Sequence, residues 1–228
     1  MHLRRLLVAV VTAALTGPAL AVVATTAPAS AATATHIVGP DGDPWIAGPS
    51  SRSQPGVPVY GDTLSLSIKV VTDGGEQVYD GAITVEQQLA GRSTWTTVAS
   101  SASAYLYDSI TARGNATYRV TYSGSGDYSP SSDAVTASIQ RKLEFKNVGT
   151  RKVVLSGKVS PKYRGKVAIF KQQGKKWKKF KTVRTNAKGR FSTPLPAPRT
   201  GRFYWKMEIP GGKAFAKTQT GKFYTYSY

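Results

Sequence analysis

The sequence predicts an all-β protein of two antiparallel β-sandwiches in tandem, preceded by a cleaved signal peptide. Three observations lead to this prediction. Helical periodicity is nearly absent after residue 31, and short runs of alternating apolar and polar residues take its place. Clusters of Gly, Pro, Asn and Ser separate these runs at regular intervals. The order of the runs in the first half recurs in the second, which indicates duplicated domains rather than one large sheet.

Residues 1–31 have the composition of a signal peptide. Arg4 and Arg5 precede an apolar run over residues 6–15, and Ala29-Ser30-Ala31 fits the small-residue rule for a cleavage site. We expect cleavage after Ala31 by the general secretory route, since the charged segment is too short for a good twin-arginine signal. An uncleaved membrane anchor is the alternative, but Pro18 interrupts the run before it could span a bilayer.

The chain has no cysteine, which excludes a lipoprotein anchor, a disulfide framework and cysteine–zinc sites together. A secreted chain of this kind depends on apolar cores alone. Residues 32–228 are long enough for two cores of about 100 residues each. Residues 32–50, rich in Ala and Thr and then in Gly and Pro, are expected to be a flexible leader that partly joins the first sheet.

Residues 51–140 are predicted to form the first sandwich, which is acidic. The segment Thr63–Val70 alternates strictly and places its apolar side chains on one face. Further strands are predicted around Ile83–Gln87, Tyr118–Tyr122 and Val135–Ile139. Each run has one apolar and one polar face, as in antiparallel sandwiches. The boundary is expected near Gln140, where the sign of the charge changes without a Gly or Pro linker.

Residues 141–228 repeat this plan in a strongly basic form. Trp95 and Val98 follow one strand as Trp177 and Phe180 follow another. In both copies the tryptophan stands three residues before the apolar residue, so strict alternation would place them on opposite faces. We therefore expect a bulge or twist at this point. A second match, residues 117–122 with 203–209, places Trp205 opposite Arg119.

Several motifs of the second half carry a family resemblance: Gly157–Pro161, Val167–Ile169, Trp177, Thr182–Phe191 and Tyr204. On these motifs the chain resembles the bacterial Ig-like and fibronectin-III-like repeats of secreted actinobacterial proteins. Asn186 and Gly189 suit a hairpin turn with positive φ, and Phe191 returns the chain to the core. The resemblance implies Ig-like sandwiches and is nearly silent about function, because such sandwiches host unrelated activities.

Neither an active site nor a cofactor is predicted. After cleavage His36 is the only imidazole, and no G-x-S-x-G, H-E-x-x-H or P-loop pattern is present. The carboxylates lie mostly in turns rather than across a cleft, which disfavours a glycosidase. Asp41-Gly42-Asp43 is the best metal candidate, but it lacks further carboxylates at fixed offsets, so we expect a solvated turn and no metal.

The distribution of charge is the feature that points to a partner. Residues 141–228 contain 24 Lys and Arg against Glu144 and Glu208 alone, whereas residues 36–140 contain five basic and ten acidic residues. The whole chain has a formal charge of +19. A surface this basic attracts polyanions over a Debye length. The candidate partners are wall teichoic-type polymers, anionic phospholipid headgroups, acidic glycans and extracellular nucleic acid.

The predicted polyanion site lies on and around the hairpin over residues 171–181. A surface that serves only solubility does not need charges of a single sign, yet nearly all charges here are positive. Lysine exceeds arginine, which favours diffuse attraction over bidentate recognition. Aligned with Arg119, Trp205 is expected to face outward and to contact the ligand. The predicted site residues are Lys171, Lys175, Lys176, Lys178, Lys179, Lys181, Arg184, Lys188, Arg190 and Trp205.

Two functional hypotheses follow. In the first, a secreted or wall-associated protein without enzymatic activity attaches to an anionic polymer through its basic half. In the second, the sandwiches form a structural or adhesive module that binds a protein or glycan, and the lysines serve only to keep exposed strands soluble and unaggregated. An unrecognised enzyme is a third possibility and requires a deep polar cleft with a perturbed carboxylate.

Overall fold

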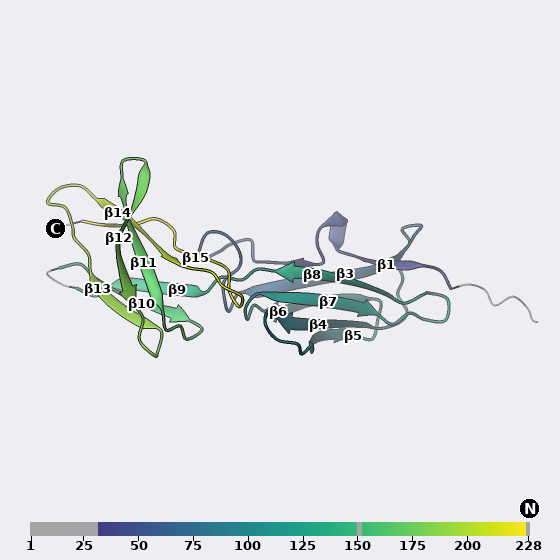
Figure 1. The fold of residues 1–228 in the computed structure, drawn as a ribbon. Coiled ribbons are helices and arrows are strands. Elements are labelled where there is room, and N and C mark those ends of the chain that lie inside the picture. The colour runs from purple at the N-terminus through teal and green to yellow at the C-terminus, as the bar shows by residue number, and fades with distance from the viewer. Residues whose placement is uncertain (1–31, 150–151, 227–228) are drawn as a thin grey trace, which may run out of the picture. The chain divides into compact units, whose positions relative to one another are not determined.

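The computed structural model describes residues 32–149 and 152–226, and within these ranges the chain is all-β apart from one short 3-10 turn (Figure 1). The predicted signal peptide and its cleavage site lie outside the described residues. All paired strands are antiparallel, as predicted. No helix in the described ranges is long and apolar enough to cross a membrane.

The first half forms two sheets that pack as a sandwich. One sheet joins β1 and β2 to β3 and β3 to β6, and the other has the order β5-β4-β7-β8. This division of strands is that of Ig-like sandwiches. The elements are β1 (Thr35–Val38), η1 (Pro40–Gly42), β2 (Ile46–Ala47), β3 (Thr63–Thr72), β4 (Ile83–Leu89), β5 (Thr96–Ser101), β6 (Tyr105–Thr111), β7 (Ala116–Tyr122) and β8 (Ser131–Ala137).

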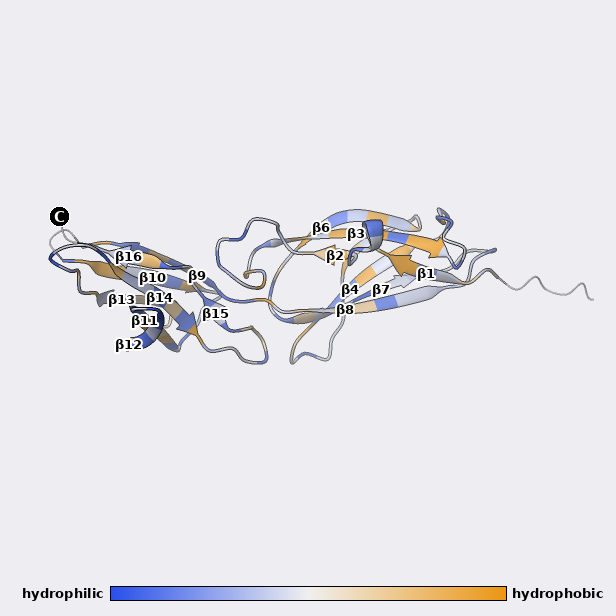
Figure 2. Cartoon of the chain, turned by 90° about the horizontal axis from the view of Figure 1, so that it is seen from above, coloured by the Kyte–Doolittle hydropathy of each residue, from blue (hydrophilic) through white to orange (hydrophobic). Residues whose placement is uncertain are grey.

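The alternating runs of the first half bury the faces that the sequence predicts. Leu64, Leu66, Ile68 and Val70 of β3 are all buried, while most of the residues between them are at least partly exposed. Figure 2 shows the same alternation of apolar and hydrophilic bands along these strands. On the opposite sheet, Tyr118 and other residues of β7 close the core. Burial of this phenol raises the pKa of Tyr118, and its hydrogen bond from Gln87 lowers it only in part.

The leader over residues 32–50, which the sequence predicts to join the first sheet in part, contributes two strands to it. Both β1 and β2 pair with β3. Trp45, which lies just before β2, is buried, and its Nε1 donates a hydrogen bond of 2.7 Å to Asp133 Oδ2 on β8. The Asp41-Gly42-Asp43 turn lies within η1 and its C-cap. No group of three potential metal-ligating side chains occurs among the described residues.

The second half repeats the strand order of the first. One sheet has the order β9-β10-β13, and the other β12-β11-β14, with both β15 and β16 paired to β14. The strands are β9 (Lys142–Asn147), β10 (Val154–Ser160), β11 (Lys166–Gln173), β12 (Lys176–Arg184), β13 (Arg190–Pro194), β14 (Phe203–Ile209), β15 (Thr218–Gln219) and β16 (Phe223–Thr225).

The predicted bulge is present in both halves. The register between β4 and β5 shifts after Val85 and leaves Val98 without a partner, and the register between β11 and β12 shifts after Ile169 and leaves Phe180 without one. These are the two apolar residues that follow Trp95 and Trp177. The extra residue of a bulge exchanges the inner and outer faces of the strand beyond it. A tryptophan that faces outward before the bulge can therefore be followed by residues that face the core.

Two separate hydrophobic clusters hold the chain together. The first lies between Trp45 and Ile139, and the second begins at Leu143 and includes Trp205 and Met207. No residue belongs to both clusters. This separation supports the domain boundary that we propose at residues 140–141.

Candidate functional site

The β11–β12 hairpin carries the densest group of predicted site residues. Gly174 and Lys175 form its two-residue turn, and Gln173 faces Lys176 across it. Lys171 faces Lys178 two positions further along. The side chains of Lys175, Lys176, Lys178 and Lys179 are exposed. The hairpin therefore presents four exposed ammonium groups within five residues, and Figure 2 shows it as a largely hydrophilic segment.

The lysines of the hairpin divide between the two faces of the sheet. Directly facing residues share a face, so Lys178 and Lys171 lie on the same side as Trp205, which is the core side. Lys179 faces Phe170, which faces Lys206, and these three lie on the outer side. Lys176 and Lys178 share a face, and Lys175 belongs to the turn.

A second basic group lies at the other end of β12. Arg184 faces Lys166, and Arg190 of β13 faces Lys158 of β10. Lys188 lies in the turn between β12 and β13, where Asn186 Oδ1 accepts hydrogen bonds from the backbone N–H groups of residues 188 and 190. At about 3.3 Å per residue, this end of β12 is about 26 Å from Lys176. The predicted site residues therefore form two groups rather than one.

The turn that includes Asn186 and Gly189 differs from the predicted hairpin. Gly189 has φ of 74° and Phe191 is buried, as expected. However, β12 and β13 belong to different sheets, so the turn carries the chain from one sheet of the sandwich to the other.

Lys181 has a structural contact that the sequence did not indicate. Its Nζ donates a hydrogen bond to the carbonyl oxygen of Pro194, at the end of β13 in the other sheet. The residue faces Ile169 of the core, and partial burial lowers the pKa of Lys181. This lysine links the two sheets and, like Lys171, is only partly exposed, whereas the other predicted basic residues are exposed.

The prediction for Trp205 is wrong. Its side chain is fully buried, and Nε1 donates a 3.0 Å hydrogen bond to Thr225 Oγ1. The register shows why. Val85 faces Val120 just before the first bulge, and Ile169 faces Met207 just before the second, which makes Tyr118 the counterpart of Trp205. The counterpart of Arg119 is Lys206. The sequence match was displaced by one residue, and such a shift moves a side chain to the opposite face.

The outward-facing residues of β14 are the ones that the prediction missed. Tyr204 and Lys206 alternate with the buried Trp205 and Met207. The Nζ atom of Lys206 lies 5.4 Å from the ring centroids of both Phe170 and Trp177. The period-two alternation of residues 203–209 was sufficient to find them once Trp205 is assigned to the core.

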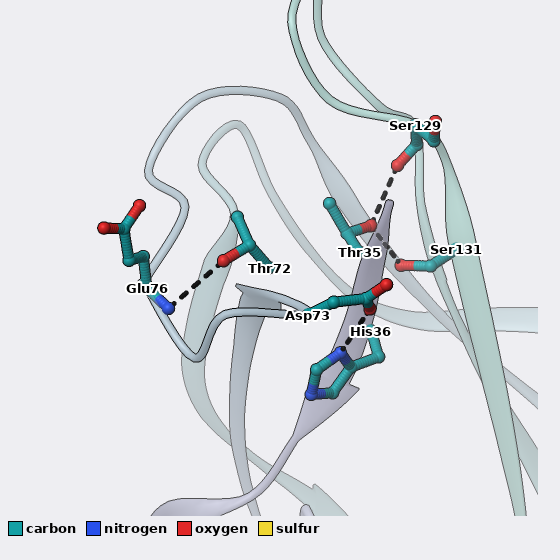
Figure 3. Close-up of polar contacts among 7 residues, drawn as sticks. All are labelled: Thr35, His36, Thr72, Asp73, Glu76, Ser129 and Ser131. Carbon is teal, nitrogen blue, oxygen red and sulfur yellow. Dashed lines mark hydrogen bonds and ion pairs between the residues drawn. The ribbon is translucent and has the colours of Figure 1, made fainter. Parts of the chain in front are cut away.

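His36 lies beside one carboxylate at the surface of the first sandwich. It lies on β1, and its Nδ1 is 3.5 Å from Asp73 Oδ1, with both side chains half or more exposed (Figure 3). The neighbouring hydrogen bonds are structural: Thr35 Oγ1 binds Ser129 and Ser131, and Thr72 Oγ1 accepts from the backbone N–H of Glu76. Neither of these contacts presents a nucleophile to the imidazole.

A hollow in the first half also lacks the acid–base side chains that catalysis commonly uses. It has a volume of about 480 Å³, and its lining includes Arg92 and Arg113 but no carboxylate and no histidine.

No family model matches the chain. No curated protein matches it either. Among solved structures, the chain is similar to the human OSCAR ligand-binding domain, with 13% sequence identity and a TM-score of 0.25; the match covers 78% of this chain and 96% of that one. A likeness of this size carries no argument about function. The Ig-like assignment follows from the strand order and register of the two sandwiches.

Proposed function

We propose that the chain is a secreted, non-enzymatic binding protein that attaches to an anionic polymer through its basic half, residues 141–228. The first sandwich then acts as an acidic spacer or as a module for a second partner. Wall teichoic-type polymers, acidic glycans and extracellular nucleic acid are the polymer classes considered. Repeating phosphates or carboxylates suit a lysine-rich surface that offers point charges rather than paired guanidinium groups.

The observation that carries the proposal is the lack of counter-charge in the basic half. Its only carboxylate side chains are Glu144 and Glu208. Among the described residues, Glu144 pairs with Lys142 at 2.9 Å, and Glu208 pairs with Lys206 and Lys217. No carboxylate side chain of the described residues lies within ion-pair distance of the exposed lysines of the β11–β12 hairpin. Repulsion among these groups destabilises the fold, and a bound polyanion relieves it.

The test measures affinity as a function of salt. Residues 32–228 are titrated with long-chain polyphosphate and with polygalacturonate, one a phosphate and the other a carboxylate polymer. With about four lysines releasing counterions, affinity should fall about a hundredfold between about 50 and about 200 mM salt. Affinity that is independent of salt, or absent for both polymers, contradicts the proposal.

A matched pair of variants locates the charge that matters. Replacing Lys175, Lys176 and Lys178 with Gln should reduce both the affinity and its salt dependence. Replacing Lys69, Arg92 and Arg113 of the first half with Gln removes the same charge and should change little. Equal effects of the two sets would mean that net charge alone governs binding.

One observation favours the alternative, a module that binds a protein or a neutral glycan. Tyr79, Tyr105 and Tyr107 of the first half are 63%, 40% and 61% exposed, and the ring centroid of Tyr105 lies 6.4 Å from that of each of the other two. Exposed aromatic clusters often mark binding surfaces. If this surface governs attachment, Tyr105→Ser with Tyr107→Ser abolishes retention on cell walls, while the lysine variants leave it unchanged.

A further inference from the structure

The outer face of the sheet β12-β11-β14-β16 carries a row of aromatic side chains. Trp177 faces Gln172, and Tyr204 faces Tyr224. Gln172 and Tyr204 are one position beyond the facing pair Lys171 and Trp205, so the four side chains follow one another across four adjacent strands. Along each strand these residues alternate with residues that face the core, so the side chains of the row lie on the solvent side of the sheet.

Cations lie between and over these rings. Lys206 is positioned over Trp177 and Phe170. The Nζ atom of Lys222 lies 4.8 Å from the ring centroid of Tyr204, and the guanidinium carbon of Arg202 lies 4.4 Å from that of Tyr224. Lys179, Lys222 and Arg202 are exposed, and Tyr224 is 46% exposed. The face therefore offers π-surfaces and positive charge within one area.

The corresponding face of the first half shows what the scaffold itself requires. There Arg119 lies 4.4 Å from the ring centroid of Trp95 and pairs with Glu86 at 2.6 Å. A cation over the tryptophan is thus common to both halves, and it serves the fold. The register gives the other counterparts as Thr117 for Tyr204, Thr136 for Tyr224, Thr97 for Lys179 and Glu86 for Phe170.

Only the second half therefore combines extra aromatic rings with extra charge on this face. The positions that hold Tyr204 and Tyr224 hold threonine in the first half, so the fold itself does not require a ring there. A purely anionic polymer would use the lysines but not the rings. A ligand that presents both a charged backbone and flat aromatic groups uses all of them.

Gln172, in the middle of the row, is fixed by the hairpin turn. Its Oε1 is buried and has no hydrogen-bond partner among the described residues, while its Nε2 donates to the carbonyl oxygen of Gly174 at 2.9 Å. Because this oxygen has no exposed surface, a ligand does not reach it, and the contact with Gly174 holds the Gln172 side chain in the row.

We propose that this face binds single-stranded nucleic acid, with bases stacked on Tyr204 and Tyr224 and phosphates held by Lys179, Lys222 and Arg202. The proposal rests on the proposed function and names its ligand class. Three strand spacings of about 4.8 Å give the row a length of about 14 Å, which is enough for a few nucleotides of a single strand. Stacking on aromatic side chains with flanking cations is the usual basis of sequence-tolerant single-strand binding.

The experiment compares two probes of equal charge. Residues 32–228 are titrated with an oligothymidylate of about twelve nucleotides and with an abasic strand of the same length. The oligothymidylate should bind about tenfold more tightly or better. Tyr204→Thr with Tyr224→Thr introduces the residues found at the corresponding positions of the first half. It should reduce the affinity for the oligothymidylate to that for the abasic strand, and change the affinity for the abasic strand by no more than about twofold.

Two further variants separate stacking from folding. Tyr204→Phe with Tyr224→Phe keeps the rings and should retain the preference for bases. Tyr105→Thr with Tyr107→Thr removes two exposed tyrosines from the acidic half and should leave the affinities for both strands unchanged.

Equal affinity for the two strands overturns the inference but leaves the proposed function intact, provided that both bind in a salt-dependent way. If neither strand binds at low salt while polygalacturonate does and responds to the Tyr→Thr pair, the face is a glycan site and the inference is wrong. If none of these polymers binds, the proposed function fails as well.

Discussion

Glu208 is the one residue of the basic half whose carboxylate is shared by two lysines. Lys206 Nζ lies 2.8 Å and Lys217 Nζ 2.7 Å from its oxygens, and its side chain is only 15% exposed. Burial on its own raises the pKa of this carboxyl, but the hydrogen bonds and charges of the two ammonium groups outweigh burial and hold the pKa of Glu208 below its ordinary value of 4.5. The ionised form is therefore favoured in the folded protein.

Glu208→Gln should lower the free energy of unfolding by about 1 kcal/mol at neutral pH. A carboxyl whose pKa is lowered by folding stabilises the protein above its unfolded pKa, and this contribution is lost as the pH falls through the folded pKa. The difference between the variant and the parent should therefore narrow below about pH 4. Urea denaturation at neutral and acid pH measures it.

Glu144→Gln is the matched control, since Glu144 is 54% exposed and pairs with a single lysine. It should change stability little at either pH. A pH-independent loss in Glu208→Gln would show that the ion pairs are not the source of the effect.

Single residues also show where sequence interpretation reaches its limit. The alternation of residues 203–209 is visible in the sequence, and the face that holds Trp205 is the apolar one, since the other face holds Lys206 and Glu208. The wrong prediction for Trp205 comes from the match with residues 117–122. Its displacement by one residue becomes visible only in the pairing of β11 with β14, a contact between residues far apart in the chain.

Among the elements, the turn between β12 and β13 is the most constrained by its backbone. Gly189 has φ of 74°, and a Cβ atom there would lie 2.5 Å from the carbonyl oxygen of Val159. That oxygen cannot easily retreat, because the N–H of Val159 donates a 2.9 Å hydrogen bond to the carbonyl oxygen of Gly189. This contact joins the turn to β10 in the other sheet.

Gly189→Ala should therefore destabilise the basic half by more than about 2 kcal/mol, the sum of left-handed strain and a steric clash. Gly174→Ala is the control: Gly174 also has positive φ, but nothing lies within 4 Å of the place that a Cβ atom would occupy, so it should lose only the strain of about 1 kcal/mol. Thermal unfolding of both variants gives the comparison. Equal losses would show that the contact with Val159 is unimportant.

The elements differ in how far the sequence could predict them. Strong alternation identified β3, β4 and β7, and the spacing of Trp and the next apolar residue identified both bulges. The strands β1 and β2 were not identified, since they are short and surround a Gly- and Pro-rich turn. Their position depends on pairing with β3 and on the Trp45–Asp133 hydrogen bond, which no local pattern encodes.

For the molecule as a whole, we expect the two halves to respond differently to a polyanion. Each half has its own hydrophobic cluster, and the excess positive charge belongs to the second. Calorimetry of residues 32–228 should then show two transitions, of which Gly189→Ala lowers only that of the basic half. Polyphosphate at about ten times its dissociation constant should raise this same transition by about 6 °C or more, because binding to the folded state adds about 1.4 kcal/mol. The other transition should remain in place. A single transition that moves as one unit would contradict the division at residues 140–141, and a shift of the acidic half alone would contradict the assignment of binding to the basic half.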